Sequence, residues 1–278
     1  MIVKQDVIYS RNNPQIKWVY KLKDKKEREN ERCFFVEGEK LVFEAIEKCL
    51  PLTRVYVMKS KLGYFLPRLE RKMQTNAYNN CEVFIVKDDV FQKISTENSP
   101  QGILSVIKYL DFFNNLDIIN REKLIKCHGE RSIILSSLRD PGNLGAVIRS
   151  SVGFGVDHIY VSSDCADVYN SKTVRGAMGT IFNVKISIVS NLVDLVNEFR
   201  QSGRHVYAAE LREGARDLNE IDLCSSDVFV IGNEGHGIPE DVSEACDASV
   251  YIPIASNTES LNASVAAAVI MWEQSKLK

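Results

Sequence analysis

Residues 228–239 have the sequence VFVIGNEGHGIP, in which a short apolar run passes directly into a glycine-rich loop. The run Val228–Ile231 is β-branched and aromatic, which predicts a buried strand. The loop holds three glycines within six residues, and such loops expose backbone amides and adopt positive φ angles. It matches neither the phosphate-binding loop of nucleotide hydrolases nor the dinucleotide-binding glycine pattern.

Short apolar runs recur on both sides of this strand, separated by segments of helical periodicity. Strands that alternate with helices predict a parallel sheet with helices on both faces. We expect strands at 132–136, 158–161, 184–189, 205–209, 228–231 and 250–254. We expect helices at 144–153, 172–178, 192–201 and 261–276. The last helix should bury a stripe formed by Leu261, Val265, Ala268, Val269 and Trp272.

The N-terminal part of the chain also alternates between helix and strand signals, and predicts a small α/β domain at 1–110. We expect one basic helix from Asn13 to about Arg32 and another helix at 38–48. The expected strands are 33–36, 54–58, 81–86 and 103–107. Residues 111–131 predict a linker with a short helix around 121–126, and residues 132–278 predict the second domain.

Charge is distributed unevenly between these domains. Residues 1–110 contain 20 Lys and Arg against 14 Asp and Glu, whereas the rest of the chain contains 15 against 23. The first domain is therefore basic inside a chain of net charge −2. This asymmetry predicts a polyanionic partner for the first domain, with drift in surface charge as the alternative.

The seven cysteines include no Cys-x-x-Cys pair, which argues against both a disulfide framework and a structural zinc site. No apolar run approaches the roughly 20 residues that a membrane-spanning helix needs. The start of the sequence lacks the long apolar region of a secretory signal. We expect a cytoplasmic protein without membrane or metal partners.

Two further loops, 139–149 and 252–266, follow expected strands and precede expected helices. In the first, we expect Asn143 to cap the helix, and Arg149 could clamp a phosphate with two hydrogen bonds. The alternative is a capped helix with a solvated arginine. In the second, Ser260 and Asn262 open a helix whose free amides could hold a polar or anionic group.

The three loops together, in this order, resemble the SpoU (TrmH-type) family of RNA ribose methyltransferases of the SPOUT superfamily. The family motifs are Asn-x-Gly-x-x-x-Arg, then Gly-x-Glu-x-x-Gly, then Ser-Leu-Asn with a small residue. The matching residues are Asn143, Gly145 and Arg149, then Gly232, Glu234 and Gly237, then Ser260, Leu261, Asn262 and Ala263. Residues 35–38, Phe-Val-Glu-Gly, are similar to the start of an RNA-binding domain that many members carry.

This resemblance implies an α/β trefoil-knot methyltransferase domain with a parallel sheet, preceded by a small α/β ribosomal-protein-like RNA-binding domain. It implies a homodimer that uses S-adenosylmethionine, without a metal, to methylate a ribose 2′-hydroxyl of structured RNA. Large-subunit (23S-type) rRNA is expected rather than tRNA. A non-catalytic RNA-binding assembly factor of the same fold and an unrelated α/β enzyme with a nucleotide cofactor are the alternatives. Cofactor binding and methyl transfer distinguish the three.

The resemblance also assigns roles to individual residues. The expected catalytic residues are Asn143, Arg149, Glu234, Ser260 and Asn262. The expected cofactor-binding residues are Glu210, Leu211, Gly232, Gly237, Ile252 and Leu261. The expected RNA contacts, on the basic N-terminal helix beside Trp18 and Tyr20, are Lys17, Lys21, Lys25 and Arg28. Which group removes the hydroxyl proton is left open, because a guanidinium normally stays protonated.

Overall fold

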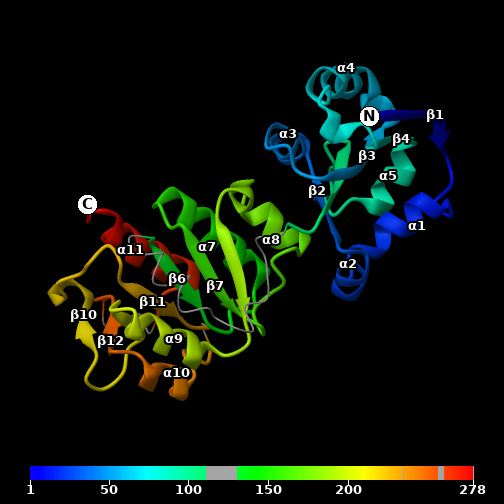
Figure 1. Ribbon diagram of the computed structural model, residues 1–278. Helices are drawn as coiled ribbons and strands as arrows, with labels where there is room; N and C mark the ends of the chain where they lie inside the picture. The colour runs from blue at the N-terminus through cyan, green and yellow to red at the C-terminus, as the bar shows by residue number, and fades with distance from the viewer. Residues whose placement is uncertain (111–129, 234, 256–259, 278) are drawn as a thin grey trace. The chain divides into compact units, whose positions relative to one another are not determined.

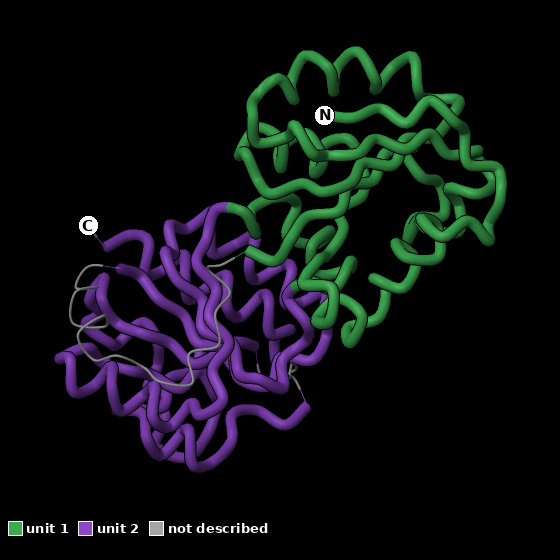
Figure 2. The backbone as a smooth tube through the Cα atoms, turned by 45° about the vertical axis from the view of Figure 1, so that its right-hand side comes forward, with its two compact units in different colours: residues 1–110, 169–182 green, residues 111–168, 183–278 purple. Residues whose placement is uncertain are grey.

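The computed structural model describes residues 1–110, 130–233, 235–255 and 260–277. The chain divides into two compact units (Figures 1 and 2). Unit 1 comprises residues 1–110 and 169–182, and unit 2 comprises residues 111–168 and 183–278. Residues 121–126, where a short helix was expected, lie outside the described part of the chain.

Segment 169–182 differs from the predicted boundary, which placed it in the second domain. It contains α8 (Ser171–Gly176) and packs with unit 1. The centre of the Tyr169 ring lies 4.4 Å from that of Phe34 and 4.1 Å from that of Tyr109. Local periodicity cannot predict this packing, because the contacts join segments far apart in the sequence.

Unit 1 is built on a five-stranded sheet of order β1-β4-β3-β5-β2. β1 and β3 run parallel to β4, whereas β5 runs antiparallel to both β3 and β2. Helices α1 and α5 cover one face, and α3 and α4 cover the other (Figure 1). The strands are β1 (Ile2–Ile8), β2 (Cys33–Glu37), β3 (Leu52–Met58), β4 (Glu82–Val86) and β5 (Ile103–Lys108). The helices are α1 (Pro14–Lys21), α2 (Lys25–Glu31), α3 (Glu39–Glu47), α4 (Leu62–Lys72) and α5 (Asp88–Ile94).

The basic N-terminal segment forms two helices, α1 and α2, so the prediction of one continuous helix was wrong. Asp24 begins α2 by accepting hydrogen bonds from two backbone amides of its first turn. The guanidinium of Arg28 turns back and donates to the carbonyls of Leu22 and Lys23 at the end of α1. These side-chain hydrogen bonds satisfy backbone groups that a helix break would otherwise leave without partners.

Unit 2 contains a seven-stranded sheet of order β10-β12-β9-β11-β6-β7-β8, in which every pair of neighbours is parallel. Helices α7 and α11 cover one face and α9 and α10 the other, as the alternation of elements predicted (Figure 1). The strands are β6 (Ser132–Leu135), β7 (His158–Ser162), β8 (Lys185–Val189), β9 (Val206–Ala209), β10 (Arg216–Asp217), β11 (Val228–Ile231) and β12 (Ala248–Tyr251). The helices are α7 (Pro141–Gly153), α9 (Leu192–Gln201), α10 (Glu240–Ala245) and α11 (Ala263–Ser275).

Helix α11 buries a different face from the one predicted. Val265 and Trp272, expected in the core, remain 48% and 49% exposed. The helix is apolar on more than one side, so periodicity alone could not identify the buried side. Its buried residues are Ala263, Ala267, Ile270, Met271 and Gln274.

Candidate active site

A pocket of about 670 Å³ opens in unit 2 where three adjacent parallel strands end. Strands β9, β11 and β12 contribute the residues at and beyond their carboxyl ends, and the start of α11 completes the wall. Ligands of open α/β sheets bind at this edge, because the loops that leave the strands diverge there. The lining includes all six predicted cofactor-binding residues: Glu210, Leu211, Gly232, Gly237, Ile252 and Leu261.

Sequence reasoning missed much of the apolar lining of this pocket. β12 ends at Tyr251 rather than at Ile254, so Ile252–Ile254 form a wall of the pocket instead of a strand. Leu218 comes from a short connecting turn that had no distinguishing signal. Such a lining, apolar side chains combined with loop backbone, suits a ligand with a flat apolar part and several hydrogen-bonding groups.

The glycine-rich loop closes on itself beside the pocket. The amide of Asn233 donates to the carbonyl of Gly237 at 3.1 Å, and the amide of Gly237 donates back at 2.9 Å. A Cβ on Gly232 would lie 2.5 Å from the carbonyl carbon of Gly237, closer than side-chain atoms approach backbone. Gly237 itself has φ +68°, a conformation that favours glycine. Glu234, at the centre of this loop, lies outside the described residues.

Glu210 places a carboxylate in the pocket wall directly after β9. Its Oε1 accepts hydrogen bonds from the hydroxyls of Ser243 and Ser249, and lies 3.6 Å from the guanidinium of Arg212. The backbone amide of Glu210 also donates to the carbonyl of Val250 on β12. These interactions fix the side chain, which therefore enters the pocket wall as an ordered negative charge.

The first turns of α7 and α11 meet through two asparagines. Asp140 caps α7 and accepts a hydrogen bond from the Asn143 amide at 2.9 Å, so the prediction that Asn143 is the cap was wrong. The Oδ1 of Asn143 instead accepts a hydrogen bond from the Nδ2 of Asn262 at 3.2 Å. Asn262 is itself the cap of α11, because its Oδ1 accepts from the amide of Ser264. The structure thus joins the first and third motifs.

Arg149 and Ser260 are both exposed, but only one of them lies at the pocket. Ser260 lines the pocket just ahead of α11. Arg149 lies on the exposed side of α7, and within the described ranges its side chain forms no hydrogen bond with either asparagine of the pair. Its planar fork is therefore available to an anion approaching this face.

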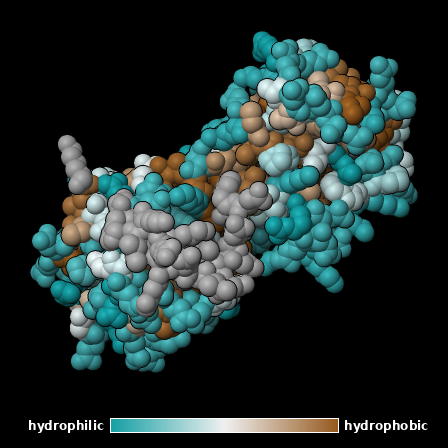
Figure 3. Space-filling view, in the orientation of Figure 1, coloured by the Kyte–Doolittle hydropathy of each residue, from teal (hydrophilic) through white to brown (hydrophobic). Residues whose placement is uncertain are grey.

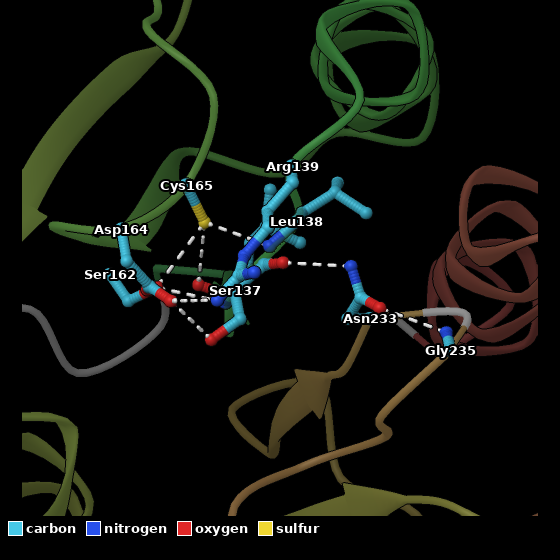
Figure 4. Close-up of polar contacts among 9 residues, drawn as sticks. Ser137, Leu138, Arg139, Ser162, Asp164, Cys165, Asn233 and Gly235 are labelled. Carbon is cyan, nitrogen blue, oxygen red and sulfur yellow. Dashed lines mark hydrogen bonds and ion pairs between the residues drawn. The ribbon is translucent and has the colours of Figure 1, made fainter.

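A hydrogen-bond network behind the pocket connects β6, β7 and the glycine-rich loop (Figure 4). Ser137, which follows β6 and has φ +55°, accepts a hydrogen bond at its carbonyl from Asn233 at 3.0 Å. Its hydroxyl donates to Asp164 at 2.7 Å, and the hydroxyl of Ser162 donates to the other oxygen of that carboxylate at 2.6 Å. Burial acts to raise the pKa of Asp164, but these hydrogen bonds outweigh it and hold the pKa below its usual range. No local sequence pattern predicted this network, because its members come from segments far apart in the chain.

The predicted RNA contacts of unit 1 divide into two groups. Lys17, Lys21 and Lys25 are exposed, and the surface over α1 and α2 is hydrophilic (Figure 3). Arg28 is only 2% exposed and donates to backbone carbonyls, so its prediction as an RNA contact is corrected to a structural role. Trp18 packs partly against the core rather than presenting its ring to solvent.

The described part of the chain contains neither a clustered metal site nor a helix that could span a membrane. No group of three or more His, Cys, Asp or Glu side chains is arranged there to hold a metal ion. None of the helices it contains combines the length and the hydrophobicity required to cross a bilayer.

Comparison with known proteins identifies the family of both parts of the chain. Residues 130–272 match the model of the SpoU rRNA Methylase family, and residues 13–105 match the MRM3-like substrate binding domain. The chain is 30% identical to the 23S rRNA (guanosine(2553)-2′-O)-methyltransferase RlmP of Bacillus subtilis, over 95% of this chain and 97% of that protein. This chain belongs to the SpoU rRNA methylase family.

Further SpoU relatives cover nearly the same length. A 23S rRNA (uridine(2479)-2′-O)-methyltransferase of Streptomyces viridochromogenes is 27% identical over 96% of this chain and 90% of that protein. The crystal structure of an AdoMet-bound rRNA methyltransferase from Sinorhizobium meliloti superimposes with a TM-score of 0.84 at 28% identity, covering 99% and 98% of the two chains. The two-part layout of the SpoU fold with a substrate-binding domain therefore extends over the whole chain.

Proposed function

We propose that this protein transfers a methyl group from S-adenosylmethionine to a ribose 2′-hydroxyl of structured RNA, with large-subunit rRNA as the substrate. The observation that carries the proposal is the pocket at the ends of β9, β11 and β12, which gathers the six predicted cofactor residues. The names of the Bacillus and Streptomyces relatives, both 23S rRNA methyltransferases, favour rRNA over tRNA.

The pocket fits S-adenosylmethionine on its own features. A Cβ on Gly232 would clash with the backbone of Gly237, so glycine at this position lets the loop fold back tightly and form the pocket wall. Apolar residues such as Ile252 and Leu261 offer surface to an adenine ring, while neighbouring backbone groups can bind its edge. Gly232, Ile252 and Leu261 would hold the cofactor, with Glu210, Leu211 and Gly237 completing the wall.

When bound, S-adenosylmethionine supplies a methyl group already activated by its sulfonium, so the remaining tasks are to position the ribose and assist its deprotonation. Arg149 binds the phosphate beside the target ribose and stabilises the negative charge that develops on the 2′-oxygen. Asn143 and Asn262, joined by their hydrogen bond, hold the nucleotide in line. Ser260 and Glu234 are assigned to the same positioning task.

The test is methyl transfer from labelled S-adenosylmethionine to large-subunit rRNA prepared from cells that lack the gene. We expect label on a ribose 2′-oxygen, and a fall in kcat of about 10²–10³ in Arg149→Ala, the scale for loss of one group that stabilises a developing oxyanion. Arg149→Lys keeps the charge but loses the fork, and a near-normal rate in that variant would contradict the role of Arg149. Cofactor binding without transfer to any RNA would favour the assembly factor instead, and label in tRNA would change the substrate.

Family membership supports two further proposals about architecture. We propose that residues 132–278 form a trefoil knot, an exception to the rule that chains do not thread loops. We also propose that the protein is a cytoplasmic homodimer, without a metal cofactor, that pairs through the half-exposed apolar side of α11. Val265 and Trp272 leave on that side an apolar surface that a second copy would cover.

Sedimentation tests the dimer directly. We expect the wild-type protein to sediment as a dimer, and Trp272→Asp to sediment as a monomer, because a charge would be buried without a partner. A wild-type monomer at micromolar concentration would contradict the proposal.

A further inference from the structure

Three neighbouring parallel strands of unit 1 end side by side, and a solvent-facing residue follows each of them. Tyr9 follows β1, Lys59 follows β3 and Lys87 follows β4. The register places Ile8 and Met58 on either side of Val86, so the three following residues emerge along one edge of the sheet. They line a shallow surface hollow together with Ser60, Asp88 and Asp89.

The hollow presents an aromatic face beside cations. Tyr9 is 59% exposed, and the Nζ of Lys59 lies 3.2 Å from its hydroxyl and 5.4 Å from its ring centre. The two carboxylates of the hollow are already engaged, since Asp88 accepts from the amide of Ser60 and Asp89 pairs with Lys87. No carboxylate in the described ranges forms an ion pair with Lys59.

A chain of contacts continues from this hollow to a second exposed ring on α1. Arg11 donates to the carbonyl of Asp89 at 3.1 Å, and Lys93 on α5 donates to the carbonyl of Arg11 at 3.1 Å. The Nζ of Lys93 lies 5.4 Å from the ring centre of Tyr20, a residue that is 46% exposed. We call this continuous surface the basic–aromatic track. It consists of Tyr9, Arg11, Tyr20, Lys59 and Lys93.

We propose that the basic–aromatic track binds an unpaired segment of the RNA substrate, with bases stacked on Tyr9 and Tyr20 and phosphates held by the cations between them. Aromatic rings can stack only on bases that are free of a duplex, whereas a duplex offers such a surface little beyond its phosphates. The inference rests on the proposed function and states how the same RNA is held. Tyr9 precedes residues 13–105, so the match to the substrate binding domain does not extend to it.

The test measures RNA affinity of the full chain carrying Tyr9→Ala, Tyr20→Ala or both. The probes are a short fluorescent single-stranded RNA of mixed sequence and the duplex that it forms with its complement. Each substitution should weaken single-strand binding about tenfold and the pair about a hundredfold, the scale measured for loss of one stacked base. Duplex affinity should change less than about twofold, and Tyr9→Phe should bind as wild type because the ring is kept.

Tyr64→Ala is the matched control in the same unit. Tyr64 is also exposed and also lies beside a cation, Arg68, at 4.8 Å, but it is on α4 and hydrogen bonded to Glu39. Unchanged single-strand affinity in the double variant, or an equal loss in Tyr64→Ala, would overturn the proposal.

Methyl transfer to rRNA separates this proposal from the one on which it rests. The double variant should raise the KM for rRNA at least tenfold while keeping kcat, because both rings lie outside the catalytic pocket. If the wild type transfers the methyl group and the double variant has an unchanged KM, the track does not bind the substrate. The proposed methyl transfer is then still supported. If the wild type transfers no methyl group, the proposed function is contradicted. The affinities for the short RNAs still decide whether the track binds single strands.

Discussion

Both units place their candidate binding surface at the carboxyl ends of parallel strands. The loops and side chains that follow those strands differ between the two units. In unit 2, the ends of β9, β11 and β12 are enclosed by loops and by the start of α11, which makes a pocket lined by backbone and apolar side chains. In unit 1, the ends of β1, β4 and β3 carry Tyr9, Lys87 and Lys59 on an open surface. An enclosed edge suits one small molecule, whereas an open edge suits a polymer.

The difference shows that strand direction selects the edge, and that the following loops select the kind of ligand. The loop after β11 folds back through the paired Asn233 and Gly237 and covers the strand ends. The connections after β1 and β4 lead away into helices and leave their first side chains in solvent. Substitutions at the two edges should therefore impair different binding steps.

The largest effect on cofactor affinity should come from adding a side chain at Gly232, beside the enclosed edge. Gly232→Ala would put a Cβ 2.5 Å from backbone of Gly237, so the loop must move. We expect the affinity for S-adenosylmethionine to fall about a hundredfold or more, equivalent to about 3 kcal/mol. Calorimetry would measure the change, and single-strand RNA affinity should stay as in the wild type.

Gly235→Ala is the matched control in the same loop. A Cβ there would meet Asn233 at 3.4 Å, an ordinary van der Waals contact. An equal loss of cofactor affinity in both variants would mean that the loop tolerates no side chain anywhere, and would remove the special role of Gly232.

A smaller effect should follow from loosening the support behind the pocket. Asn233→Ala removes the hydrogen bonds to the Ser137 carbonyl and from the Gly235 amide, each worth about 1 kcal/mol. We expect cofactor affinity to fall about tenfold by calorimetry, while the Tyr9 edge keeps its RNA affinity. Asn79→Ala, an exposed asparagine of unit 1, should leave cofactor affinity unchanged. Equal cofactor affinity in the wild type and Asn233→Ala would show that the network is not needed to shape the loop.

The smallest effect on cofactor binding should come from a substitution of His158, at the opposite, amino edge of the unit 2 sheet. Its main effect should be on the pH dependence of stability. Burial lowers the pKa of His158, the first residue of β7, to about 4. Between that value and the unfolded pKa of about 6.5, only the unfolded chain takes up the proton, so stability falls as the pH falls through this window. The fall should be about 2 kcal/mol between about pH 7.5 and pH 5.

Urea unfolding of His158→Gln at both pH values measures this contribution. Glutamine does not titrate, so we expect the variant to lose much less stability on acidification than the wild type, with its cofactor affinity at neutral pH unchanged. An identical pH dependence in both proteins would assign the acid sensitivity to another group. A large loss of cofactor affinity would contradict the separation of the two edges.

The pocket was predictable from sequence because each of its walls follows a strand. The parallel-sheet rule placed the loops that follow the strands at one edge, and the family resemblance assigned Gly232, Ile252 and Leu261, which line the pocket. The cap of α7 was assigned wrongly because the helix was expected to begin at residue 144, directly after Asn143, whereas it begins at Pro141. Asp140 followed by Pro141 is nevertheless the stronger helix-start signal.

Other features were missing from the sequence prediction for physical reasons. Helix α4 contains Gly63 and Pro67, which weaken the helical signal of an otherwise amphipathic segment. β1 is an edge strand with polar residues on both faces, so it lacks the alternation of a half-buried strand. The support for Asn233 through Ser137 and Asp164 joins three separate segments, and no local pattern encodes such contacts.

The central claim is that this chain places a methyl group on a ribose 2′-oxygen of large-subunit rRNA. A methylated 2′-oxygen cannot attack the neighbouring phosphodiester, so alkaline cleavage of rRNA skips the bond that follows it. We would map alkaline cleavage of large-subunit rRNA from cells with the gene, without it, and without it but supplied with the wild type or Arg149→Ala. One protected bond that disappears on deletion and returns only with the wild-type gene is the predicted result. Identical cleavage patterns in all four RNAs would contradict the claim.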